Sequence, residues 1–389
     1  MNRALPGARP TAPPLRATRR RDVCYAAPVS GSGDGPTKTI GVDLWGGQER
    51  GAHQNVGTAV WPSGPAHARP GPRELFLSAY RQFAPGCREV DEPGVAIVAV
   101  EERTGRPAGV VRIGARVDRH VAAIVGRHDE CDLYLDGVDR LALRHLAIIL
   151  DPVISWRAGE QDIRYRILDL RTRDGFADEA GRRLRGLRCE GPALLQCGGH
   201  ALFALPLGDP TDWPARAEDA WAALPERVYF DEADHFRQGT RVAGVREPRV
   251  VAGDARDAST RRSLITRTAG PRDSAVVALD DGEIAGVLEL VGPSCKETIR
   301  IGHAALKDGV LLGRYARCDG AGGLADDSTL SRVHALLLQV DDRALVVDTA
   351  SKNGTWEHGE RPRSRVFALG GDSELLLGTT TRARWRWLS

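Results

Sequence analysis

Short apolar runs alternate with turn residues over most of the chain from about residue 94 onwards. The runs VAIVAVEE, HVAAIVGR, LAIIL and YRILDL lie in the first stretch, and ALLLQV, ALVVD and ELLLG lie in the last. Runs this short, rich in β-branched residues and regularly spaced, are typical of strands in a β-sandwich. The pattern therefore predicts an all-β fold.

Changes in this pattern divide the chain into four segments. Residues 1–90 are rich in Pro, Gly, Ala and Arg, and we predict a disordered or weakly folded segment there. Residues 91–208 and 273–389 are the strand-rich regions. Residues 209–272 read as a connector with one short helix at Pro214–Leu224, since proline suits a first helical turn. We expect Trp213 and Trp221 to pack on a neighbouring domain.

The two strand-rich regions look like one unit written twice. Arg-Ile-Gly, Gly-Arg and Cys-Asp occur in that order in Arg112–Asp132 and again in Arg300–Asp319. Further on, LALRHLAIIL aligns with TLSRVHALLL, and YRILDLRTRDG aligns with ALVVDTASKNG. A recurring unit of this kind predicts tandem domains with a shared fold.

Composition narrows the classes of function. The 389 residues carry a formal net charge of +2, which gives no global attraction to nucleic acid or to an acidic membrane. No apolar run approaches the ~18 residues that span a bilayer, and we expect a cytoplasmic protein. The 7 cysteines form no CxxC pair. The spacing of Cys189, Cys197 and His200 is only loosely similar to that of metal ligands, which is a weak signal. We therefore expect no metal and no cofactor.

Polar residues at the strand ends of the second copy gather into one constellation. Gly313-Arg314 closes one apolar run, Ser331-Arg332-Val333-His334 precedes the next, and Lys352-Asn353-Gly354 follows another. Loops cluster at the ends of a sandwich, so these groups are expected to meet at one rim. Arginine forks, a hydroxyl, an ammonium and an amide together suit a phosphate ester on a peptide.

The order of these motifs, Gly-Arg, then Ser-x-x-His, then Asn-Gly, resembles that of forkhead-associated (FHA) domains. The resemblance covers about residues 275–388. The resemblance implies an eleven-stranded β-sandwich that binds phosphothreonine peptides through its loops. By the same resemblance, Arg314 and Ser331 contact the phosphate, Arg332 and Lys352 add donors, and Asn353 holds the peptide main chain. Thr329 lies where the choice of the third residue after the phosphothreonine is made. The architectural residues of the site are Gly313, His334 and Gly354. If Asp326 and Asp327 face the site, they weaken phosphate binding or favour basic residues in the ligand.

The first copy departs from the FHA pattern where a ligand would bind. Arg127 and His145 remain, but Ala142 replaces the serine and Asp174 replaces the asparagine. A carboxylate repels a dianionic phosphate and alanine supplies no donor. We therefore predict a degenerate FHA-like domain that has lost phosphothreonine binding. Arg127 and Arg173 leave open the weak binding of another acidic ligand.

These features favour a signalling adaptor over an enzyme. We find no catalytic motif, and GDGPTKT at Gly33–Thr39 only approaches a phosphate-binding loop. The expected partners are phosphothreonine-containing proteins, such as Ser/Thr kinases or their substrates. An intramolecular phosphosite is also open, at Thr11, Thr18, Thr37, Thr39, Thr260, Thr266 or Thr268. The alternatives are a phosphate-independent scaffold and, less favoured, an Arg-rich nucleic-acid binder without any membrane role.

Overall fold

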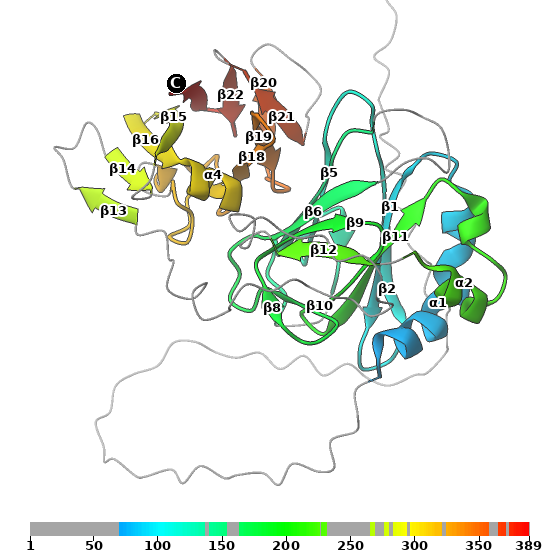
Figure 1. The fold of residues 1–389 in the computed structure, drawn as a ribbon. Coiled ribbons are helices and arrows are strands. Elements are labelled where there is room, and N and C mark those ends of the chain that lie inside the picture. Colours follow the sequence, from blue (N-terminus) through cyan, green and yellow to red (C-terminus); the bar gives the residue numbers. More distant parts are fainter. Residues whose placement is uncertain are drawn as a thin grey trace, which may run out of the picture.

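A computed structural model describes residues 70–136, 140–153, 163–225, 227–231, 265–268, 276–279, 283–293, 296–320, 324–357, 365–370 and 373–388. Strands dominate this part of the chain and form two β-sandwiches, one in each half (Figure 1). The predicted all-β class with two tandem sandwiches is confirmed.

The first sandwich pairs two six-stranded sheets, with strand orders β2-β1-β11-β10-β7-β8 and β12-β9-β6-β5-β3-β4. Alternate residues of β1, such as Val95 and Ile97, face the core between the sheets, while Ala96 and Val98 face outwards. The strands are β1 (Gly94–Glu101), β2 (Pro107–Gly114), β3 (Val121–Gly126), β4 (Leu133–Tyr134), β5 (Leu146–Leu150), β6 (Arg164–Asp169), β7 (Phe176–Asp178), β8 (Arg183–Leu184), β9 (Gly186–Glu190), β10 (Ala193–Cys197), β11 (His200–Leu207) and β12 (Val228–Asp231).

The second sandwich repeats this plan. Its sheets have the orders β13-β14-β16-β15-β23-β22-β20 and β17-β18-β19-β21. Its elements are β13 (Ile265–Thr268), β14 (Val276–Leu279), β15 (Ile284–Val291), β16 (Lys296–Gly302), α4 (His303–Asp308), β17 (Val310–Leu312), β18 (Ala335–Val340), β19 (Arg343–Asp348), β20 (Thr355–Glu357), β21 (Val366–Leu369), β22 (Glu374–Leu377) and β23 (Thr381–Trp387). The order β16-β15-β23-β22-β20 matches β2-β1-β11-β10-β7, and β21-β19-β18-β17 matches β9-β6-β5-β3. The sequence repeat is thus a repeat of topology.

The prediction that residues 1–90 lack regular structure is wrong for α1 (Pro72–Arg88). Leu75, Phe76, Ala79, Tyr80 and Phe83 recur at helical spacing and are buried against the outer face of β1 and β11. Pro72 begins the helix, where its missing N–H costs nothing. The proline-rich surroundings and Pro85 concealed this periodicity. Residues 1–69, with Arg-rich and GDGPTKT stretches, lie outside the described residues.

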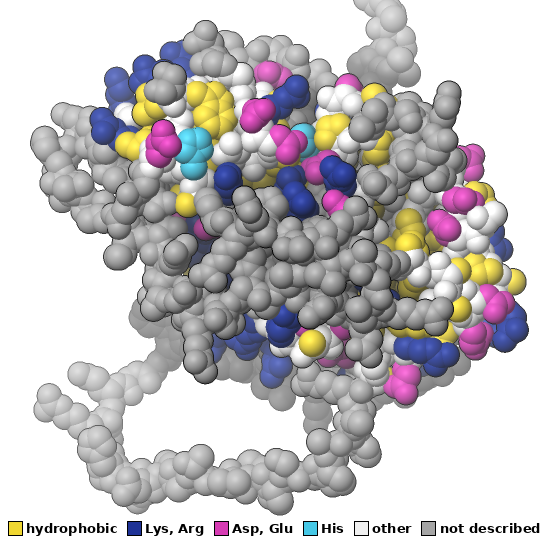
Figure 2. Space-filling model, in the orientation of Figure 1, with side chains coloured by type: hydrophobic (Ala, Val, Ile, Leu, Met, Phe, Trp, Pro, Cys, Tyr) yellow, Lys and Arg dark blue, Asp and Glu magenta, His cyan; other side chains and the backbone are white. Residues whose placement is uncertain are grey.

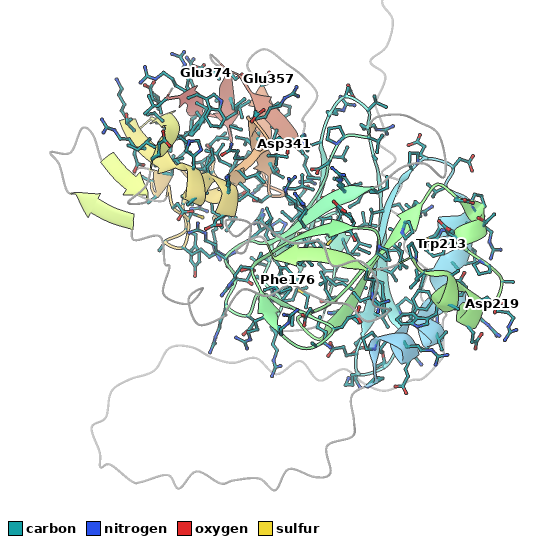
Figure 3. All side chains as sticks on the ribbon, viewed as in Figure 1. Phe176, Trp213, Asp219, Asp341, Glu357 and Glu374 are labelled. Carbon is teal, nitrogen blue, oxygen red and sulfur yellow. The ribbon has the colours of Figure 1, made fainter. Side chains whose placement is uncertain are left out.

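Part of the predicted connector belongs to the first sandwich. Helix α2 (Ala217–Ala223) confirms the expected short helix, and β12 pairs with β9. Trp213, which is labelled in Figure 3, stacks on Tyr80 at 6.4 Å between ring centroids, and the ring centroids of Trp221 and Phe76 are 5.2 Å apart. Both tryptophans therefore pack with α1 against the first sandwich, which precedes them in the chain. Strands β13 and β14 instead extend the sheet of the second sandwich.

The two sandwiches dock through the outer faces of equivalent sheets. Apolar side chains of β3, β5 and β6 form one buried cluster with those of β17, β18 and β19. Its strand members are Ala122, Ile124, Ala147, Ile149, Leu168, Leu311, Leu336, Leu338, Val340, Leu345 and Val347. Each of these sheets is therefore buried on both faces, which explains the uninterrupted apolar runs of β5 and β18.

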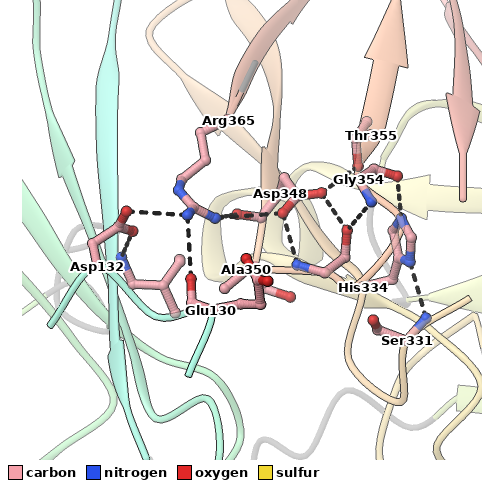
Figure 4. Close-up of polar contacts among 12 residues, drawn as sticks. Glu130, Asp132, Ser331, His334, Asp348, Ala350, Gly354, Thr355 and Arg365 are labelled. Atoms are coloured by element: carbon pink, nitrogen blue, oxygen red, sulfur yellow. Dashed lines mark hydrogen bonds and ion pairs between the residues drawn. The ribbon is translucent and has the colours of Figure 1, made fainter. Parts of the chain in front are cut away.

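Arginines of both domains cross the edge of this apolar contact. Arg365 bonds Asp348 of its own domain at 3.5 Å and Asp132 of the first domain at 3.0 Å (Figure 4). Arg171 pairs in the opposite direction with Asp319, the counterpart of Asp132 in the repeat. Arg144 donates to the Ala350 carbonyl from Nε at 3.1 Å and from Nη2 at 2.6 Å. The interface thus has matched polar contacts from both copies.

In the described part of the chain, no helix combines the length and the apolar character needed to cross a bilayer.

Candidate functional site

The site is built on a close approach between two loops of the second sandwich. A Cβ atom on Gly313 would lie 2.5 Å from the Arg332 carbonyl oxygen, so only glycine allows this contact. The Arg314 N–H donates to the Ser331 carbonyl at 3.3 Å, and the Tyr315 N–H donates to the Arg332 carbonyl at 3.0 Å. These bonds place Arg314 beside Ser331.

The Ser331 hydroxyl ties a third loop into the site. Its oxygen accepts a hydrogen bond from the Lys352 backbone N–H at 2.9 Å. The serine is 8% exposed, whereas Arg314 and Lys352 are exposed. Among the described residues the hydroxyl has no acceptor for its own hydrogen, which leaves that hydrogen free to be donated to a ligand.

His334 braces two of these loops from beneath. Its Nδ1 accepts from the Ser331 N–H at 3.0 Å, so its Nε2 carries the proton and donates to the Gly354 carbonyl at 3.1 Å (Figure 4). The imidazole is fully buried, which excludes direct contact with a ligand. The architectural positions of Gly313, His334 and Gly354 follow from these contacts.

A buried turn below the rim shapes the Lys352 loop, and the sequence analysis missed it. The Asp348 carboxylate accepts hydrogen bonds from the Ser351 N–H at 2.8 Å and from the Ser351 hydroxyl at 2.5 Å. The Thr355 hydroxyl donates to the same carboxylate at 3.0 Å. Ser351 in turn accepts from the Gly354 N–H at 3.0 Å. The repeat contained the signal for this turn, since Asp169 and Thr172 have the same spacing in the first copy.

Asn353 closes the other side of the rim. Its Nδ2 donates to the Thr329 carbonyl at 2.7 Å, while no described residue donates to its Oδ1. The Thr329 hydroxyl donates to Asp327 at 2.7 Å, so it is engaged within the domain. Asp327 is buried and also accepts from Thr380 and Thr381. Burial opposes the ionisation of this carboxyl, but the hydroxyl donors outweigh burial and lower its pKa. Asp327 thus supports the loop as an anion, whereas Asp326 is exposed.

The predicted residues therefore meet as a basic rim around a small polar centre. Arg314, Ser331, Lys352 and Asn353 are linked through the contacts above, and Thr329 supports them. Arg332 is exposed beside Ser331, and no contact joins its side chain to the other described site residues. Two cations, a hydroxyl donor and an amide can together hold an anion and an adjoining backbone.

The first sandwich repeats the frame of this site with different side chains on its surface. His145 Nδ1 accepts from the Ala142 N–H at 3.0 Å, and its Nε2 donates to the Gly175 carbonyl at 2.8 Å. Arg127 is exposed at the position of Arg314, and its Nε donates to the Leu141 carbonyl at 2.7 Å. Asp174 occupies the place of Asn353. The frame is present, but the hydroxyl and the amide are not.

Comparisons with known proteins identify a family for part of the second sandwich. Residues 310–378 match the family model of the FHA domain. Solved structures with a likeness include the FHA domain of the CT664 protein from Chlamydia trachomatis, at 20% identity and a TM-score of 0.24, over 27% of this chain and 99% of that chain. Rv1747 FHA-1 from Mycobacterium tuberculosis is 20% identical with a TM-score of 0.22, over 27% and 99%.

The yeast Dun1 FHA domain, solved in complex with a doubly phosphorylated (pT) peptide, is 21% identical with a TM-score of 0.22, over 31% of this chain and 82% of that chain. No curated protein matches the sequence. The region that brings the three loops together is thus an FHA domain, which the family match places at residues 310–378.

Proposed function

We propose that the C-terminal FHA domain binds phosphothreonine peptides and that the protein acts as a signalling adaptor. The observation that supports this most strongly is the Ser331 hydroxyl, which lies between exposed Arg314 and Lys352 with its hydrogen unused by any described residue. A dianionic phosphate placed there gains charge-assisted hydrogen bonds from both cations and a hydroxyl donor.

Each of the remaining site residues acts on either the phosphate group or the peptide part of the ligand. Asn353 offers its free Oδ1 to a backbone N–H of the ligand, because its Nδ2 is already held by the Thr329 carbonyl. Arg332 adds an exposed positive charge beside the phosphate. Thr329 contributes to the choice of peptide through the loop shape that its hydrogen bonds fix.

FHA domains are binding modules, so we infer that this protein works by equilibrium binding rather than by catalysis. Its partners are then phosphorylated proteins of Ser/Thr kinase signalling, either kinases or their substrates, met in the cytoplasm. Phosphothreonines of the chain itself would compete at a high effective concentration. Of the candidates, Thr11, Thr18, Thr37, Thr39 and Thr260 lie outside the described residues.

The test is binding of the full-length chain to an oriented phosphothreonine peptide library, with matched threonine and phosphoserine peptides. The full chain is required because removal of the first sandwich would uncover Leu336, Leu338 and Val347. Arg314→Ala should weaken binding roughly tenfold to a hundredfold, since one charge-assisted hydrogen bond contributes about 1.5–3 kcal/mol.

The matched control is Arg300→Ala, which removes an exposed arginine from β16 of the same domain. Equal binding of phosphorylated and unphosphorylated peptides, or equal affinity of wild type and Arg314→Ala, would overturn the proposal. The second result would favour a phosphate-independent scaffold.

A further inference from the structure

A large cavity lies at the loop end of the first sandwich, where the second sandwich has its FHA site. Its volume is about 1330 Å³. Its lining includes Ala142, Gly175 and Phe176, of which Phe176 is labelled in Figure 3. A single phosphate would fill only a small part of it, because pockets for whole small molecules span about 300–1,000 Å³. The cavity therefore suits a larger ligand than a phosphothreonine side chain.

The lining of this cavity is strongly basic. Two acidic residues, Glu102 and Asp174, face six arginines: Arg103, Arg127, Arg140, Arg173, Arg183 and Arg317. Figure 2 shows basic side chains gathered beside β8 and β10, the strands at this end of the first sandwich. Such an excess of guanidinium groups in one concave surface favours a ligand with several negative charges.

Most of these arginines have no carboxylate partner in the described part of the chain. Arg103 pairs with Glu101 at 3.3 Å, but no ion pair within the described residues engages Arg127, Arg140, Arg173, Arg183 or Arg317. The Arg127 Nε is anchored on the Leu141 carbonyl, which fixes the guanidinium and leaves its terminal nitrogens to donate. Arg317 also lines the cavity, with its guanidinium 5.6 Å from the centroid of the Tyr315 ring. Donors are thus available on several sides of the cavity.

Two substitutions remove from the first copy the side-chain ties that hold the equivalent loops of the second copy. In the second copy the Ser331 hydroxyl ties the Lys352 loop, and Asn353 ties the Thr329 loop. Ala142 has no hydroxyl to accept a hydrogen bond from the backbone N–H of Arg173, and the carboxylate side chain of Asp174 has no N–H to donate to the Arg140 carbonyl. Neither of these two side-chain ties can therefore form in the first copy.

Arg317 belongs to the second sandwich and reaches this cavity across the domain interface. It follows Arg314 by three residues and lies close to Cys318, which is part of the apolar interface. Its charge also reaches the buried His145 beneath the cavity: burial is the main cause of the lowered pKa of that histidine, and Arg317 lowers it further. The basic lining is therefore complete only in the docked tandem.

We propose that this cavity is a second anion site, which binds a soluble ligand with two or more clustered phosphate groups. The arginines of the first sandwich and Arg317 supply the donors. Asp174 excludes a lone phosphate from the position that it takes in an FHA site, and it can accept a hydroxyl or N–H of the ligand. The site is separate from the phosphothreonine site and does not depend on it.

The test is titration of the full-length chain with tripolyphosphate by calorimetry, against inorganic monophosphate as the single-phosphate control. We expect saturable one-to-one binding of tripolyphosphate, at least tenfold tighter than monophosphate. Arg173→Ala should weaken it about tenfold and Asp174→Asn should tighten it severalfold, because each changes one charge in the lining. Arg81→Ala, which removes an exposed arginine of α1, should have no effect.

Arg127→Ala provides a second variant, with unfolding curves to establish that each protein is folded. Unaltered affinity in folded Arg127→Ala and Arg173→Ala, or equal affinity for the two phosphates, would overturn the proposal. Binding of a single-stranded oligonucleotide without any binding of tripolyphosphate would overturn it too, in favour of a nucleic-acid surface. Phosphothreonine peptide affinity should be unchanged in Arg173→Ala, so failure here is distinguishable from failure of the FHA proposal.

Discussion

The two sandwiches share a buried frame and differ on the surface that it supports. His145 and His334 each accept a backbone N–H at 3.0 Å and each hold a glycine carbonyl. Thr172 and Ser351 each donate to an aspartate at 2.5 Å. Because both copies retain these buried contacts, the frame is a requirement of the fold rather than of one ligand.

The ligand-facing positions show the opposite behaviour. Ser331 and Asn353 tie the loops of the second copy together, whereas Ala142 and Asp174 supply neither tie in the first copy, whose loops line a cavity with six arginines. Two side-chain differences thus remove both loop ties from the first copy. A buried frame that two domains share therefore does not by itself predict which ligand each domain binds.

The largest effect is expected when the second copy is given the surface of the first. Ser331→Ala with Asn353→Asp removes a phosphate donor, breaks both loop ties and adds a negative charge. Phosphothreonine peptide affinity should fall about a hundredfold or more, since two hydrogen bonds of about 1.5 kcal/mol or more are lost. Fluorescence anisotropy with a labelled peptide measures this, and a loss below threefold would contradict our account of the rim.

The next prediction concerns the contact between the domains at Arg144, whose guanidinium donates to the Ala350 carbonyl. Ala350 has a left-handed backbone with φ of 61° and directly precedes Ser351 of the binding loop. Arg144→Met should lower the free energy of unfolding by about 1.5–3 kcal/mol and weaken peptide binding about threefold. Urea unfolding and peptide titration measure both. Arg81→Met is the control, and unchanged stability would show that the contact is not formed in solution.

A smaller effect of opposite sign is expected when the first copy is given the surface of the second. Ala142→Ser with Asp174→Asn restores a hydroxyl acceptor for the Arg173 N–H and an amide donor for the Arg140 carbonyl. Stability should rise by about 1 kcal/mol, because a net hydrogen bond contributes about 0.5–1.5 kcal/mol. Chemical unfolding decides this, and a less stable double variant would show that the two loops do not close in this copy.

The smallest effect concerns pH. Burial lowers the pKa of His120, His128, His145 and His200, all in the first sandwich. The unfolded chain therefore binds more protons below about pH 6.5, and stability is lost as pH falls through that value. Among the described carboxyls, burial raises the pKa of Asp212 and Asp319, which acts in the opposite direction, whereas the lowered pKa of Asp327 acts in the same direction as the histidines. The urea midpoint should be lower at about pH 5.5 than at about pH 7.5, and an equal or higher midpoint would contradict this sign.

The sequence predicted the fold class, the repeat and the loops that meet, because each depends on local patterns. Short β-branched runs specify strands, and glycine is the only residue that permits the approach of Gly313 to the Arg332 carbonyl. The positions of Arg314, Ser331 and Asn353 followed from strand ends. Their roles toward a ligand remain predictions.

Other features depend on contacts between distant segments and could not be predicted in this way. Arg317 reaches the cavity of the first sandwich only because the domains dock. The docking itself had an unused signal: LAIIL and ALLLQV are apolar at every or nearly every position, which indicates strands covered on both faces. Helix α1 was hidden because its apolar spacing lies between proline-rich stretches.

The central claim is that the two copies share a frame but only the second binds phosphothreonine. Hydrogen–deuterium exchange of the full-length chain, with and without a saturating phosphothreonine peptide, tests this directly. We predict slowed exchange at residues 329–332 and 351–354, with no change at the equivalent residues 140–143 and 172–175. Protection of the first set of loops by the same peptide, or of neither set, would contradict the account.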